Sequence, residues 1–202
     1  HEPTKHQYDF DSATCLAFLQ NAGLQNEIKL NIEVNHATLS GHNFEHEIAY
    51  AISNNALGSI DINRGDTLLG WDTDQFPNNP AELIMSFYFI FKNGGLGKGG
   101  MNFDAKIRRQ SIDPEDLFHA HIGGMDVCAK TLLATEKLIK DNIIPQFIED
   151  RYSDWNNDFG KFIHDKNTDL DHIHKKILDN NIEPKPRSGR QEYLENILNK
   201  YL

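Results

Sequence analysis

The stretch Lys29-Leu30-Asn31-Ile32-Glu33 is a short apolar run that ends in a carboxylate, and the chain repeats this pattern twice. The other two runs are Leu57-Gly58-Ser59-Ile60-Asp61 and Gly100-Met101-Asn102-Phe103-Asp104. Each run precedes a polar, turn-rich loop and then a helix-like stretch, which is the pattern of βα units. Enzymes built from successive βα units keep their chemistry at the carboxyl ends of the strands. We therefore predict an α/β fold in which these three acids converge.

Helix signals precede, separate and follow the three predicted strands. Apolar spacing and capping residues predict helices from Asp11-Ser12 to Gly23, over Phe44–Ser53, over Ala81–Lys92, and from Asp113-Pro114 to Cys128 or on to Lys140. Residues 35–41 and 62–80 are predicted to be loops. No strand signal follows residue 142, so we expect residues 1–142 to hold three βα units and 143–202 to form a helical extension.

Composition excludes several classes of partner. The 202 residues carry 30 acids and 20 bases, a net charge of −10, which argues against binding to nucleic acid or to an anionic membrane surface. No apolar stretch approaches the ~20 residues of a membrane span. Cys15 and Cys128 are the only cysteines. Two cysteines do not make a disulfide framework, so a reducing cytoplasm is the expected location.

Further potential ligands lie near the three strand-end acids. His36 follows Glu33 by three residues, and Asp72-Thr73-Asp74 puts two acids on one side of an extended segment. Converging carboxylates repel one another unless a cation lies between them. Five carboxylates and one imidazole suit Mg²⁺, Mn²⁺ or Co²⁺ better than structural zinc. Six ligands exceed what one metal normally takes from protein, so two metals sharing one carboxylate is the natural interpretation.

Other interpretations of these residues compete with a metal site. Any single acid after a strand is more often a helix cap or a turn residue. His42, His46, Glu45 and Glu47 resemble a metal cluster, but the segment lacks the second histidine of a zinc-protease helix. We interpret it as the polar face of an amphipathic helix.

Longer motifs resemble the C-terminal half of xylose isomerase, in the longer-chain class of that family. The resemblance covers essentially the whole chain and is carried by Glu2 to Asp9, Asn31 to Leu39, Asn63 to Asp66, Gly70 to Pro77, Asn102 to Lys106, Arg108 to Ser111, His121 to Gly123, and Ser188 to Glu192. It implies the last three βα units of a TIM (β/α)8 barrel, followed by a helical extension that associates with a neighbouring subunit.

The resemblance assigns a role to each potential ligand. Glu33 resembles the carboxylate that bridges two divalent metals, and Asp61 and Asp104 resemble ligands of the metal that holds the substrate. His36, Asp72 and Asp74 resemble ligands of the second, catalytic metal. The implied reaction interconverts D-xylose and D-xylulose, and D-glucose and D-fructose, by a hydride shift. Asp72 would assist a metal-bound water in moving the hydroxyl proton.

The chain also departs from the family pattern. The first five strands are absent, together with one further metal-ligand Glu, a substrate-side Lys, the His–Asp pair of ring opening and a shielding Trp. Three strands cannot close a barrel. We therefore expect the missing N-terminal half to be a partner, or the chain to be an inactive fragment. Another TIM-barrel sugar isomerase or epimerase is a third interpretation.

Oligomerisation is expected in either case. The intact family forms homotetramers, and for this chain we expect a dimer or larger assembly. Apolar side chains that would face the missing half are expected to be exposed: Leu30, Ile32, Ile60, Met101 and Phe103 on the strands, and Phe87 and Phe91 on a helix.

Overall fold

The computed structural model describes residues 9–202, and these divide into two compact units. The first runs up to residue 139 and includes residues 199–202, and the second spans Lys140–Leu198. Residues 2–8, which carry part of the family resemblance, lie outside the described part of the chain. No helix in residues 9–202 is both long and apolar enough to cross a membrane.

A parallel three-stranded sheet forms the centre of the first unit. Its strands are β1 (Leu30–Glu33), β2 (Leu57–Asp61) and β3 (Met101–Asn102), in the order β1-β2-β3. The register pairs Glu33 with Asp61 and Asp61 with Asn102. The carboxyl ends of the strands are therefore level, and side chains at these ends lie at one edge of the sheet.

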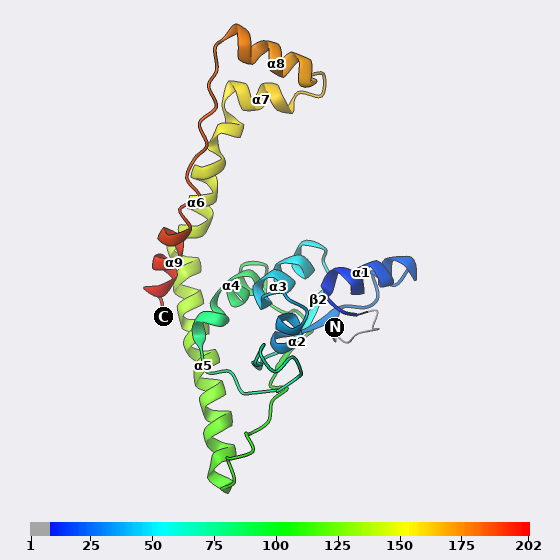
Figure 1. The fold of residues 1–202 in the computed structure, drawn as a ribbon, viewed down its shortest axis with the longest axis vertical. Helices are drawn as coiled ribbons and strands as arrows, with labels where there is room; N and C mark the ends of the chain where they lie inside the picture. Colours follow the sequence, from blue (N-terminus) through cyan, green and yellow to red (C-terminus); the bar gives the residue numbers. More distant parts are fainter. Residues whose placement is uncertain (1–8) are drawn as a thin grey trace. The chain divides into compact units, whose positions relative to one another are not determined.

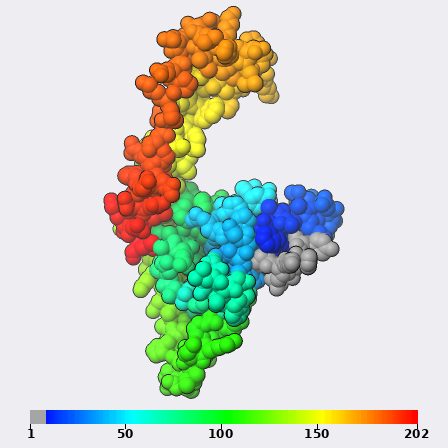
Figure 2. Space-filling view, in the orientation of Figure 1, coloured from blue at the N-terminus to red at the C-terminus, as the bar shows by residue number. Residues whose placement is uncertain are grey.

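Helices precede, connect and follow the strands (Figure 1). They are α1 (Ser12–Asn21), α2 (Val34–Leu39), α3 (Phe44–Ser53), the 3₁₀ turn η1 (Pro80–Glu82), α4 (Ile84–Lys92) and α5 (Pro114–Asp141). The Asp11 side chain accepts from Thr14 N and the Asn43 side chain from His46 N, so side-chain caps begin α1 and α3. α1 packs against α3 and β1, and its blue atoms adjoin those of α3 in Figure 2.

The hydrophobic core lies between the sheet and the helices. Ile32 and Ile60 from the sheet, Ile48 from α3 and Phe87 from α4 are all at most 1% exposed. The expectation that Leu30, Ile32, Ile60 and Phe87 would be exposed is therefore wrong, because α1, α3 and α4 cover these side chains. Met101 and Phe91 are 41% and 46% exposed, as expected, and Phe103 is half-buried.

Three local predictions are corrected by the structure. Residues 34–39 form the helix α2 instead of a loop, and Thr38 Oγ1 donates to Val34 O at 2.8 Å within it. The third strand ends at Asn102 instead of Asp104, because its pairing with β2 stops where Asn102 meets Asp61, the last residue of β2. The Gly123-Gly124 pair does not break α5, and a Cβ on the buried Gly124 would lie 3.2 Å from the rings of Phe76 and Phe103, so glycine allows these rings to pack closely on the helix.

The second unit contains short helices and a linker before α9 that hydrogen bonds hold in place. Its elements are α6 (Ile143–Tyr152), the 3₁₀ turn η2 (Ser153–Asn156), α7 (Asp158–His164), α8 (Leu170–Asp179) and most of α9 (Gln191–Asn199). Arg187 donates two hydrogen bonds to Asp154 and a third to Asp150 O. Arg151 donates to Ser188 O at 2.7 Å. These contacts fix the proline-containing linker before α9 against α6 and η2.

Candidate metal centre

The carboxyl edge of the sheet carries the three strand-end acids. Glu33 and Asp61 are the last residues of β1 and β2, and they are paired in the register. Asp104 lies two residues beyond β3. One oxygen each from Glu33, Asp61 and Asp104 lies within 4.8 Å of the other two. The acids that the sequence predicts to converge therefore do so.

Glu33 also belongs to a second group, with His36 and Asp72. The helix α2 begins directly after Glu33, so His36 lies one turn further on, and its Nδ1 is 3.3 Å from Glu33 Oε2. The other ring nitrogen, Nε2, lies 2.9 Å from Asp72 Oδ2. Two groups of potential ligands thus share Glu33, which is 3% exposed.

Asp74 belongs to neither of these two groups of potential ligands, although its carboxylate contacts Asp72. Its backbone adopts a left-handed conformation with φ 42°, and its carboxylate is hydrogen-bonded to Asp72. Lys106 Nζ donates to Asp74 Oδ2 at 2.6 Å. The other oxygen, Oδ1, is buried and has no hydrogen-bond partner in the described chain. A buried carboxylate oxygen without a donor is a suitable ligand for a cation.

Asparagine amides hold the carboxylates of the site in place. Asn63 Nδ2 donates to Glu33 Oε1 and, at 2.9 Å, to Asp104 O, while its Oδ1 accepts from Asn35 N at 2.9 Å. Asn35 Nδ2 donates to Asp72. Asn31 Nδ2 and Asn102 Nδ2 donate to the two oxygens of Asp61 at 2.6 and 3.2 Å.

These amides were not among the predicted site residues, although the sequence carries a signal for them. Asn31 precedes Glu33 by two residues, Asn63 follows Asp61 by two, and Asn102 precedes Asp104 by two. Side chains two apart in an extended segment lie on the same face. The same spacing could therefore have placed these asparagines beside the acids.

A short antiparallel bridge joins the two ends of the segment that carries Asp72 and Asp74. Arg64 and Gln75 form a two-bond antiparallel bridge, with N···O distances of 2.8 and 2.9 Å. The chain after β3 then holds the segment from one side: Lys106 N donates to Asp74 O at 2.9 Å and Arg108 donates to Thr73 O at 2.7 Å. These contacts explain how a long loop can present two acids at a fixed position.

The electrostatics of the site follow from burial and crowding. Burial raises the pKa of Glu33 to about 7, and the charges of Asp72 and Asp104 act in the same direction, against the Asn63 hydrogen bond and His36. Burial and the hydrogen bond with Asp74 raise the pKa of Asp72. Burial would also raise the pKa of Asp74, but its hydrogen bonds with Asp72 and Lys106 lower it overall.

The donor set fits divalent metal ions with a preference for oxygen. Four carboxylates and one imidazole meet at one sheet edge, with Asp74 beside them, and a cation there would compensate the buried charge of Glu33. Mg²⁺ and Mn²⁺ prefer such oxygen ligands. Because the two groups share Glu33, the donor set suits two ions with that carboxylate between them.

Known proteins are similar to this chain over its full length. It is 54% identical over 201 residues to "Xylose isomerase" of Ruegeria sp. (strain TM1040). It is 55% identical over 201 residues to the proteins of the same name from Histophilus somni (strain 2336) and Actinobacillus succinogenes (strain ATCC 55618 / DSM 22257 / CCUG 43843 / 130Z). Each alignment covers 100% of this chain and 46% of the relative. The chain thus spans about half the length of these curated relatives, to which it is homologous.

A family profile matches the end of the chain. The profile described as "XylA2 C-terminal domain" covers residues 148–202, which include α7, α8, α9 and the second half of α6. This match is consistent with the full-length similarity.

Proposed function

We propose that this chain is the carboxyl-terminal part of a xylose isomerase and supplies most of the two-metal site of that enzyme. One observation carries the proposal: two groups of potential metal ligands share Glu33 at the carboxyl edge of a parallel sheet. The identity of over 50% to xylose isomerases across the whole chain supports it.

The fold proposed for the complete protein is a TIM barrel. Three parallel strands in chain order, with helices between them and functional side chains at their carboxyl ends, match the last part of a (β/α)8 barrel. Residues 1–142 would belong to the barrel, and residues 143–202 would form a helical extension for subunit association. The barrel is completed only by strands that residues 9–202 do not contain.

Two metal positions follow from the two groups. Glu33, Asp61 and Asp104 would hold the ion that binds the hydroxyls of the substrate. Glu33, His36, Asp72 and Asp74 would hold the second ion, the last of these through its unpartnered oxygen. When bound, Mg²⁺, Mn²⁺ or Co²⁺ would stabilise negative charge on the oxygens of the two sugar carbons between which the hydride shifts.

Asp72 is the residue that we propose for proton movement. Its side chain is 40% exposed, whereas Glu33 is buried, so Asp72 can exchange a proton with groups outside the cluster. Its raised pKa makes the carboxylate a stronger base. Asn35 and His36 contact its two oxygens and fix their direction.

The proposed substrate is an aldose or ketose sugar, with D-xylose and D-xylulose as the pair and D-glucose and D-fructose as further substrates. The isolated chain is not expected to catalyse the reaction, because its cluster is partly open: Asp104 is exposed and Asp61 half-exposed. Charges that face water stabilise a transition state poorly.

Fragment complementation tests the proposal. This chain is mixed with the part of the Histophilus somni xylose isomerase that it does not match, and conversion of D-xylose to D-xylulose is measured with Mn²⁺. We expect turnover from the mixture, none from either part alone, and none when Glu33→Gln replaces the native chain. A stable complex of the two parts without turnover would favour the alternative, a folded piece with only a structural role.

A further inference from the structure

We propose that Lys106 determines which divalent ion the second metal position prefers, by leaving Asp74 only one oxygen for the ion. This role rests on the proposed function, in which Asp74 joins Glu33, His36 and Asp72 around that ion. Lys106 Nζ donates to Asp74 Oδ2 at 2.6 Å, whereas Oδ1 is buried and has no hydrogen-bond partner in the described chain. The two oxygens of this carboxylate are therefore not equivalent, and only Oδ1 is available to an ion.

Backbone contacts hold the carboxylate of Asp74 in this orientation. Lys106 N donates to Asp74 O at 2.9 Å, so the same two residues are joined by backbone and by side chain. The preceding residue, Thr73, is buried and accepts at its carbonyl from Arg108 Nη1 at 2.7 Å. Rotation of the carboxylate until both oxygens faced one ion would break the hydrogen bond with Lys106. Because the Asp74 side chain is only 15% exposed, water would replace that donor poorly.

The number of oxygens that a carboxylate offers distinguishes small from large divalent ions. Mg²⁺ requires a nearly octahedral set of ligands at roughly 2.0–2.1 Å. Ca²⁺ takes ~6–8 oxygens at roughly 2.3–2.6 Å and often binds both oxygens of one carboxylate. A carboxylate that is restricted to one oxygen therefore favours Mg²⁺, and release of the second oxygen favours Ca²⁺.

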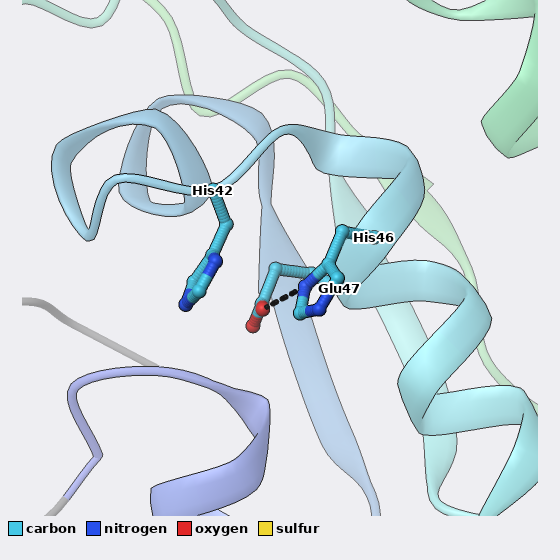
Figure 3. A group of neighbouring side chains, drawn as sticks. All are labelled: His42, His46 and Glu47. Carbon is cyan, nitrogen blue, oxygen red and sulfur yellow. Dashed lines mark hydrogen bonds and ion pairs between the residues drawn. The ribbon is translucent and has the colours of Figure 1, made fainter.

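The remaining group of potential ligands in residues 9–202 is unsuited to holding an ion. It consists of His42, His46 and Glu47, and His46 Nδ1 lies 3.1 Å from Glu47 Oε1 (Figure 3). The two imidazole rings stack at 4.6 Å with only 17° between their planes. Their lone pairs lie in these nearly parallel planes and do not point at one shared ion. Divalent ions that bind the chain should therefore report on the acidic cluster at the sheet edge.

Competition with Mn²⁺ tests the role of Lys106. The purified chain is loaded with Mn²⁺, Mg²⁺ or Ca²⁺ is added to displace it, and electron paramagnetic resonance measures the free Mn²⁺. In Lys106→Met, which frees Asp74 Oδ2, we expect the affinity for Ca²⁺ relative to Mg²⁺ to rise about tenfold. This is the lower end of the effects seen for residues that contact metal ligands. Because the Lys106 side chain is 62% exposed, the substitution leaves the hydrophobic core unchanged.

Three variants separate the contact with Asp74 from the loss of a charge. Lys106→Arg keeps a charged donor and should keep the native ratio of the two affinities. Lys98→Met removes a positive charge from an exposed position and should also keep it. In His36→Asn, which removes a ligand of the second position, the further change Lys106→Met should no longer alter the ratio.

The outcomes distinguish this role from the proposed function. A native chain that binds no Mn²⁺ would overturn the proposed metal site and the role of Lys106 together. Bound Mn²⁺ with the same ratio of Ca²⁺ to Mg²⁺ affinity in the native chain and in Lys106→Met would overturn the role of Lys106 alone. A shift of the ratio that persists in His36→Asn would likewise contradict an action at the second position.

Discussion

Glu33 has a position in a strand, at the start of a helix and in the candidate metal site. It ends β1, it directly precedes α2, and it belongs to both groups of potential ligands at the sheet edge. Its carboxylate is buried and held by Asn63 on one oxygen and by His36 on the other. Burial of a negative charge among other acids is unfavourable without a cation. This residue should therefore depend on metal more than any other acid in the site.

Replacement of Glu33 by glutamine should weaken both proposed metal positions at once. The amide keeps the shape of the side chain but removes the charge that both groups share. Titration calorimetry with Mn²⁺ should show an affinity loss of at least tenfold at both sites. Glu27→Gln, in an exposed turn, is the matched control and should bind as the native chain does. Two unaltered sites in Glu33→Gln would remove the bridging assignment.

The metal-free chain should lose stability as the pH rises from about 4.5 to about 7. Burial raises the pKa of Glu33 from 4.5 to about 7, so in this window the folded chain holds a proton that the unfolded chain has released. Protonation therefore favours the folded state below this window and ceases to do so above it. The difference is on the order of a few kcal/mol, and the raised pKa of Asp72 adds to it.

Urea denaturation with a chelator at pH 5 and at pH 7.5 measures this dependence. The native chain should unfold at lower urea concentration at pH 7.5, and Mn²⁺ should restore its stability there. Glu33→Gln should show a much smaller difference between the two pH values. A metal-free native chain that is equally stable at both would contradict the role of Glu33.

At the scale of elements, the loop between Arg64 and Gln75 must approach α2 closely. A Cβ on Gly65 would lie 1.6 Å from Asn35 Oδ1. Asn35 is 1% exposed, and its amide holds Asp72 in the site. Glycine at position 65 is therefore required by the distance between two elements, not by a turn with positive φ.

Gly65→Ala should displace Asn35 and with it Asp72. We expect weaker Mn²⁺ binding at the position formed by His36 and Asp72, and a loss of stability of about 1–3 kcal/mol from the forced contact. Gly100→Ala is a suitable control, because no atom lies within 4 Å of a Cβ placed there. Unchanged metal affinity in Gly65→Ala would show that Asp72 does not need Asn35.

At the scale of the whole molecule, much apolar surface remains exposed. Phe118, Ile122, Met125 and Leu133 on α5 are between 51% and 69% exposed. Within the described residues β1 and β3 each pair with β2 alone, so each has an open edge. Contiguous apolar surface of this extent is rare on monomers.

The purified chain should therefore associate with itself. Light scattering at low micromolar concentration should give a mass at least twice the 23.1 kDa of one chain. Addition of the missing half should compete with this association, because the same edges and faces would then be covered. A mass of one chain, unaffected by concentration, would contradict the expectation.

The sequence by itself determined several helices, two strand ends and which acids lie at those ends. The cap residues Asp11 and Asn43 and the spacing of Phe44, Ile48 and Ile52 specify α1 and α3, because capping and helical periodicity depend on residues a few positions apart. The apolar runs before Glu33 and Asp61 specify two strand ends for the same reason. Long motifs then indicated the family and its ligand set.

Only the tertiary structure decided which atoms meet. The register that pairs Glu33 with Asp61, the Asn63 amide between Glu33 and Asp104, and the clamp of Lys106 on Asp74 join residues 28 to 41 positions apart. The helix α2 and the end of β3 at Asn102 were not predicted, since six-residue and two-residue elements carry too little periodicity and depend on their neighbours. Long-range contacts depend on how elements pack, and local sequence patterns do not encode that packing.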